Sequence, residues 1–142
     1  MPFHPYLNFG GNAADAFTRY QEIFGGELVL LRMSDMPGAA DQVPPGQENL
    51  VMHAALMTEK GDLLMASDSN ESPFGPVQFM YVNYSTDDKA EAERVFKELS
   101  QDAQKIEMPF GETFFSPGFG VCVDRFGTPW MVTTNADEPF QP

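Results

Sequence analysis

Three observations predict an α+β fold in which one βαβββ unit occurs twice. The segment 6–9 (YLNF) returns at 81–84 (YVNY), an offset of 75 residues. A second match, 60–65 (KGDLLM) with 126–131 (FGTPWM), follows at an offset of 66. Finally, the secondary structure expected in the two halves follows the same order. Repetition at a long fixed period is a signature of architecture.

The length of 142 residues suits a single domain. Halves of about 70 residues would each be marginal alone, which favours two units that share one core. We therefore expect one domain over 1–142, with an N-terminal half at about 1–70 and a C-terminal half at about 76–135.

In the first half, the alternating aromatic segment 3–9 predicts a strand. Asn12 is a favourable N-cap, and apolar residues at helical spacing predict a helix over 13–24 that Gly25-Gly26 ends. Further strands are expected at 27–33, 49–59 and 62–67.

The segment 34–47, with three prolines and two glycines, predicts a loop between two of these strands. Loops of this length are often functional, so this one is a candidate lid; a plain surface excursion is the alternative.

A linker at 68–76 separates the halves. The second half is expected to begin with a strand at 77–84, and Asp87 or Asp88 caps a helix that runs to about Ser100. Strands have the weakest sequence support around 104–115. A hairpin of 118–124 with 129–134 and a frayed tail at 135–142 follow. Two such units pair their uncovered sheet faces around a central cleft, with the helices outside.

The formal net charge of −13, from 8 basic and 21 acidic residues, excludes nucleic acid as an expected partner and disfavours anionic membranes. Cys122 is the only cysteine, so no internal disulfide is possible. No apolar run approaches the length that spans a bilayer, and no signal peptide is visible. We expect a soluble, cytoplasmic protein.

Several segments resemble a known family. The segment 19–25 (RYQEIFG) is similar to a helix-end motif of the vicinal oxygen chelate (VOC) superfamily, which includes glyoxalase I, extradiol dioxygenases and bleomycin-resistance proteins. The segments 105–115 (KIEMPFGETFF) and 119–132 (FGVCVDRFGTPWMV) resemble its PhnB-like branch more closely. The resemblance implies paired βαβββ units and a homodimer. Branch members often bear a demethylubiquinone-methyltransferase label, but no glycine-rich motif for S-adenosylmethionine is present.

Enzymes of this superfamily bind a divalent metal through residues of the first and last strands of each unit. The resemblance maps those positions onto Tyr6 (or Pro5), Met65, Tyr81 and Met131. None is an ordinary ligand of a hard metal, and thioethers suit soft metals or core packing. We therefore expect no cofactor, with a divalent metal as the alternative.

Strand alternation indicates what lines the cleft instead. If Tyr6 and Tyr81 point inward, Asn8 and Asn83 do so too. Together with Met65 and Met131, these side chains form a polarisable, hydrogen-bonding surface that suits a small organic ligand.

Two residues are candidates for proton transfer. His53 is either a general base or lone ligand facing the cleft, or a hydrogen-bonded core histidine. Glu112, among aromatic residues, is either an acid–base group or a solvated turn carboxylate.

Three further residues have simpler structural explanations. Trp130 is a candidate for ligand stacking, with core packing as its alternative. Asp68 is expected to form a turn, and Cys122 to be an inert buried thiol.

The leading functional hypothesis is a protein that binds a small organic molecule in its cleft, with catalysis on that molecule left open. One alternative is a sequestering protein of the bleomycin-resistance type, compatible with the negative charge. Another is a metal-dependent lyase, isomerase or dioxygenase with a rearranged ligand set such as His53 with Glu112. The same scaffold hosts all three classes.

Overall fold

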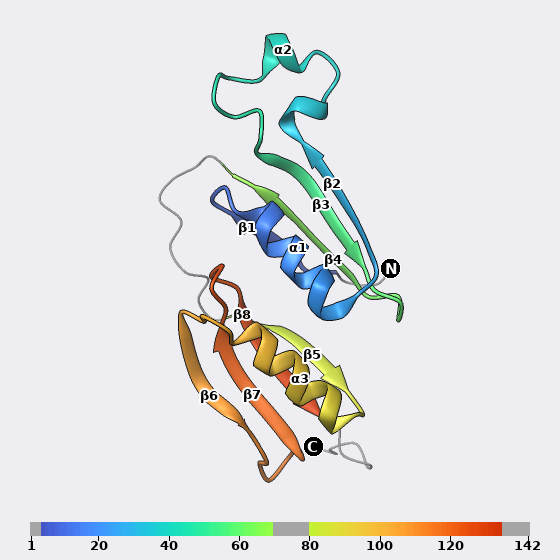
Figure 1. Cartoon of the computed structure of the whole chain (residues 1–142), viewed down its shortest axis with the longest axis vertical. Coiled ribbons are helices and arrows are strands. Elements are labelled where there is room, and N and C mark those ends of the chain that lie inside the picture. Colours follow the sequence, from blue (N-terminus) through green and yellow to red (C-terminus); the bar gives the residue numbers. More distant parts are fainter. Residues whose placement is uncertain (1–3, 70–79, 135–142) are drawn as a thin grey trace. The chain divides into compact units, whose positions relative to one another are not determined.

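The computed structural model describes residues 4–69 and 80–134. The chain divides into two compact units, Met1–Phe74 and Gly75–Pro142. Each unit is a four-stranded sheet with one long helix against one of its faces (Figure 1). Within the described residues, no helix is both long enough and apolar enough to cross a membrane.

The sheet of the first unit has the strand order β1-β4-β3-β2. Its elements are β1 (Tyr6–Phe9), α1 (Ala13–Phe24), β2 (Glu27–Arg32), β3 (Val51–Met57) and β4 (Leu63–Asp68). β1 runs parallel to β4, and the other neighbours are antiparallel. The parallel pair places Tyr6 opposite Met65 and Asn8 opposite Ser67.

Helix α1 covers one face of this sheet with an apolar stripe. Its buried residues recur at helical spacing: Ala13, Ala16, Phe17, Tyr20 and Ile23. Phe9 of β1 meets Phe17 edge to face, with ring centroids 6.2 Å apart. The helix ends at two glycines, and at Gly26 an added Cβ would lie 2.1 Å from the carbonyl oxygen of Met57.

The second unit repeats this plan with the strand order β5-β8-β7-β6. Its elements are β5 (Val82–Thr86), α3 (Lys89–Leu99), β6 (Lys105–Gly111), β7 (Gly118–Val123) and β8 (Pro129–Thr134). β5 is parallel to β8. Gly120 lets β7 approach the helix, since a Cβ there would lie 2.7 Å from the ring of Phe96. The predicted α+β fold of two βαβββ units is thereby confirmed.

Several predicted boundaries differ from those observed. The first strand begins at Tyr6, and β5 starts at Val82 and runs to Thr86, beyond the expected end at 84. The segment 34–47 begins inside a 3-10 turn at Met33–Asp35 and includes a short helix, α2 (Ala39–Gln42). Most of the expected linker and the tail at 135–142 lie outside the described residues.

Asp68 belongs to β4 and does more than form a turn, which corrects the sequence-based interpretation of this residue. One carboxylate oxygen accepts hydrogen bonds from the N–H groups of Gly11 and Ala13, each at 3.0 Å. The other accepts from the N–H of Val51 at 2.9 Å. Asn12 occupies the N-cap position of α1 but makes no side-chain capping bond, so the acceptor at this helix start comes from a distant strand.

Replacing Asp68 by alanine removes the acceptor of three backbone N–H groups. A buried donor left unsatisfied costs about 1–3 kcal/mol, and water can reach the part-buried Gly11. We expect Asp68→Ala to lower the free energy of unfolding in urea by about 3 kcal/mol. Asp41→Ala, in the exposed helix α2, is the control and should change it by less than about 0.5 kcal/mol. Equal losses of unfolding free energy in the two variants would contradict the structural role assigned to Asp68.

Cys122 lies fully buried in β7, as predicted for an inert thiol. Burial, followed by the negative charges of Asp124 and Glu107, raises the pKa of this thiol to about 12. At pH 8 only about one such thiol in ten thousand is ionised. We expect a disulfide reagent such as DTNB to label the protein only after urea unfolds it, with one equivalent of thiol released. Rapid labelling of the folded protein would refute this.

Candidate functional site

Each sheet has a second face that no helix of its own unit covers, here called the helix-free face. Residues alternate between the two faces along every strand. In the first unit the helix-free face is largely apolar. Its large exposed side chains are Tyr6, Val29, Leu31 and Met57, with 47, 52, 40 and 50% of their surface accessible.

Tyr6 and His53 meet on this face. The Tyr6 hydroxyl and His53 Nδ1 lie 3.3 Å apart, within hydrogen-bonding distance, and the two ring centroids are 5.9 Å apart. His53 lies on β3, whose residues Ala54 and Leu56 point to the helix side and are buried. The structure therefore places His53 on the face proposed from sequence, half-buried and with one ring nitrogen engaged.

Asn8 and Met65 share the face with this pair. Ser67 donates its hydroxyl to the Asn8 side-chain oxygen at 3.3 Å, across the β1–β4 pair. Met65 lies directly opposite Tyr6 in the same pair. The first unit thus gathers a phenol, an imidazole, a carboxamide and a thioether on neighbouring strands.

The second unit has a corresponding set. Asn83 and Met131 are directly opposite in the β5–β8 pair. The Asn83 oxygen accepts from the Thr133 hydroxyl at 2.8 Å, and its amide donates to the Ser85 hydroxyl at 3.0 Å. These bonds orient the carboxamide on the helix-free face.

Tyr81 precedes β5 and reaches a carboxylate on β6. Its hydroxyl donates to Glu107 Oε2 at 2.7 Å. Because β5 and β6 are the two outer strands of this sheet, the bond spans the face between its edges. The hydrogen bond is the main cause of a raised Tyr81 pKa, followed by partial desolvation and the negative charge of Glu107.

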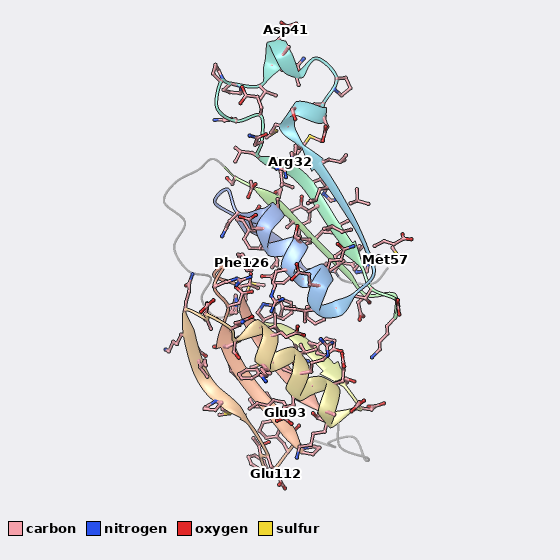
Figure 2. All side chains as sticks on the ribbon, viewed as in Figure 1. Arg32, Asp41, Met57, Glu93, Glu112 and Phe126 are labelled. Atoms are coloured by element: carbon pink, nitrogen blue, oxygen red, sulfur yellow. The ribbon has the colours of Figure 1, made fainter. Side chains whose placement is uncertain are left out.

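Trp130 and Glu112 lie apart from these groups. Trp130 is on the helix-covered side of β8, 2% exposed, and its indole N–H donates to Asp124 at 2.9 Å. It packs in the core, the alternative considered from sequence, and is not on the helix-free face. Glu112 is exposed at the turn after β6, and Figure 2 shows its side chain at the tip of the second unit. It belongs to a different unit from His53.

Glu107 is the polar residue of this face that sequence reasoning missed. Its segment (KIEMPFG) lies in the stretch where the sequence supports a strand least, and β6 shifts register between Ile106 and Met108. Glu107 falls at this irregularity, where alternation no longer predicts the direction of a side chain. The sequence feature that could have identified Glu107 is its position as a single charged residue between Ile106 and Met108, whose apolar side chains are exposed.

The positions that bind metal in the superfamily fit a hard divalent metal poorly. By the resemblance, these positions correspond to Tyr6 (or Pro5), Met65, Tyr81 and Met131. Tyr81 holds its proton, which it donates to Glu107, and the two thioethers are soft donors. Nor do three or more His, Cys, Asp or Glu side chains gather into a possible metal site anywhere in 4–69 or 80–134.

Comparison with known proteins places the chain in a class and then in a family. A glyoxalase/bleomycin resistance protein/dioxygenase domain from Frankia, 13% identical, superposes with a TM-score of 0.66 over 96% of this chain and 98% of its own, which shows the shared fold. The family model described as 3-demethylubiquinone-9 3-methyltransferase matches residues 2–133. The chain belongs to this PhnB-like family.

Individual relatives agree with this placement. The chain is 33% identical to Protein YjdN of Escherichia coli over 99% of its length and 100% of that protein. The crystal structure of PA1353 from Pseudomonas aeruginosa has 36% identity and a TM-score of 0.85, covering 96% of this chain and 99% of that one. A putative 3-demethylubiquinone-9 3-methyltransferase, PhnB protein, from Bacillus cereus has 31% identity and a TM-score of 0.77, covering 94% and 99%.

The Tyr81–Glu107 hydrogen bond predicts that the Tyr81 hydroxyl titrates at unusually high pH. The folded pKa of Tyr81 is raised above its ordinary value of 10.0. The bond therefore favours the folded state fully below that value and is lost as the pH rises through the folded pKa. We expect the Tyr81 ring signal, followed by ¹³C NMR, to titrate at higher pH than a free tyrosine.

Substituting the acceptor tests the cause of that shift. Glu107→Gln removes the carboxylate charge and should return the Tyr81 titration toward pH 10. Tyr81→Phe identifies the signal by its disappearance. A titration that Glu107→Gln leaves unchanged would show that the carboxylate is not responsible.

Proposed function

We propose that this protein binds a small organic molecule on the helix-free faces of its sheets. The observation that supports this most directly is the Tyr6–His53 pair, two hydrogen-bonding rings that remain part-exposed on a largely apolar face. Ligand sites combine apolar surface with a few oriented polar groups, and this face has that composition.

The polar groups of the first unit allow both directions of hydrogen bonding. His53 can donate or accept according to its tautomer, and Tyr6 can do the same. The amide nitrogen of Asn8 provides donors while its oxygen accepts from Ser67. A ligand with carbonyl, hydroxyl or amine groups on an apolar or aromatic frame matches this set, with Met65 contributing a polarisable contact.

A proton-transfer step is the chemistry that this arrangement supports best. The contact of His53 Nδ1 with the Tyr6 hydroxyl fixes the imidazole ring, so that Nε2 is the nitrogen left for a ligand. In this proposal His53 exchanges a proton with the bound molecule, and Tyr6 positions the imidazole.

The experiment begins with a ligand screen. A library of small aromatic amines, alcohols and acids is tested by ¹H–¹⁵N NMR, and compounds that shift the amides of β1, β3 and β4 are retained. We expect His53→Ala to weaken their binding at least tenfold. Tyr6→Phe should weaken it about fivefold, as for one hydrogen bond of about 1 kcal/mol.

Thr18→Ala, on the exposed side of α1, is the control for this series and should bind like the parent protein. The proposal fails if no compound shifts these amides, or if His53→Ala binds every retained compound as well as the parent. Incubating the retained compounds with the parent and with His53→Ala then shows whether the protein also converts them.

Sequestration without turnover is the second candidate. The net charge of −13 favours it, because an acidic protein attracts cationic compounds. It predicts stoichiometric recovery of unchanged ligand and weaker binding as salt is added.

A further inference from the structure

The strongest unassigned feature is the Glu107 carboxylate on the second unit. Tyr81 holds Oε2 of this group at 2.7 Å, whereas Oε1 has no hydrogen-bond partner within 4–69 and 80–134. No lysine, arginine or histidine of the described residues forms an ion pair with it. Glu107 is therefore an oriented anion with one oxygen available.

The position of the carboxylate over the sheet is unusual for a residue of an outer strand. In a flat sheet the outer strands of four would lie about 14 Å apart, three spacings of about 4.8 Å. Tyr81 and Glu107 nevertheless meet, so both side chains extend over the face.

The surroundings of the carboxylate are mostly apolar. Met108 on the same strand is 43% exposed and pairs with Val121, which in turn pairs with Met131 on β8. Lys105, two residues from Glu107, is the basic side chain of this strand, and it is exposed without an ion pair to Glu107. Glu107 itself is exposed. The carboxylate can therefore give a cation a charge-assisted hydrogen bond, while the apolar side chains beside it contact the ligand's apolar body.

We propose that Glu107, held by Tyr81, binds the cationic nitrogen of a ligand whose apolar body lies on Met108 and Met131. This inference rests on the proposed small-molecule function and names the chemical class of its ligand, an amine with an apolar or aromatic frame. Glu107 is a specificity residue here, and Tyr81 positions it by fixing Oε2 so that Oε1 faces the ligand.

Three probes of nearly equal shape test the proposal: phenethylamine, a cation at pH 7.5, neutral 2-phenylethanol, and anionic 3-phenylpropionate. Their dissociation constants are measured by ¹H–¹⁵N NMR from the amides of β5 to β8. We expect the cation to bind about 5- to 10-fold more tightly than the alcohol, the effect of one charge-assisted hydrogen bond, and the anion to bind least.

Three variants distinguish the effect of the Glu107 carboxylate from the effect of the protein's overall negative charge. Glu107→Gln should abolish the preference for the cation while leaving the affinity for 2-phenylethanol unchanged. Tyr81→Phe should reduce the preference in part. The control is Glu93→Gln, which removes one charge from the exposed outer side of α3 (Figure 2) and should leave the preference intact.

The outcomes distinguish this inference from the function on which it rests. If the three probes bind equally, or if Glu93→Gln removes the preference as fully as Glu107→Gln, the inference is overturned and the proposed function stands. If no probe shifts the amides of β5 to β8, the second unit does not bind this class and the inference is again overturned. The His53 screen on the first unit decides the proposed function independently.

Discussion

The first unit depends on the carboxylate of Asp68. This group, 7% exposed at the end of β4, accepts hydrogen bonds from the turn after β1, from the first residue of α1 and from the first residue of β3. The turn that leads into α1, the start of β3 and the end of β4, which are distant in sequence, are thereby joined at one point. Tyr6, Asn8 and His53 lie on β1 and β3, so the geometry of the polar set on the helix-free face follows from this junction.

In the second unit a different carboxylate, that of Asp124, holds the turn between β7 and β8. Asp124 accepts from the N–H groups of Phe126 and Thr128 and from the indole of Trp130, each at 2.9 Å. Meanwhile Asp88 caps α3 locally by accepting from Ala90 and Glu91. The two units thus share a backbone plan, while the side chains that stabilise it have diverged.

The same divergence explains what the sequence could and could not predict. Strand alternation predicted that Tyr6 and Asn8 share one face of their strand, and both lie on the helix-free face, because a period of two residues fixes which face a side chain occupies. That they and Asn83 bind a ligand stays a prediction. Alternation alone did not identify Asp68 as the acceptor at the start of α1, since its partners are 55 to 57 residues away in the chain. It failed for Glu107 because β6 changes register there.

Trp130 has a practical consequence. It is the only tryptophan of the chain, lies fully within the core of the second unit, and has its indole bonded to a buried carboxylate. Its intrinsic fluorescence therefore reports the melting of one half of the molecule and is silent about the other. The four tyrosines are divided between the halves, so emission excited selectively at tryptophan, compared with far-ultraviolet circular dichroism, shows whether the duplicated halves unfold as one cooperative body or in sequence.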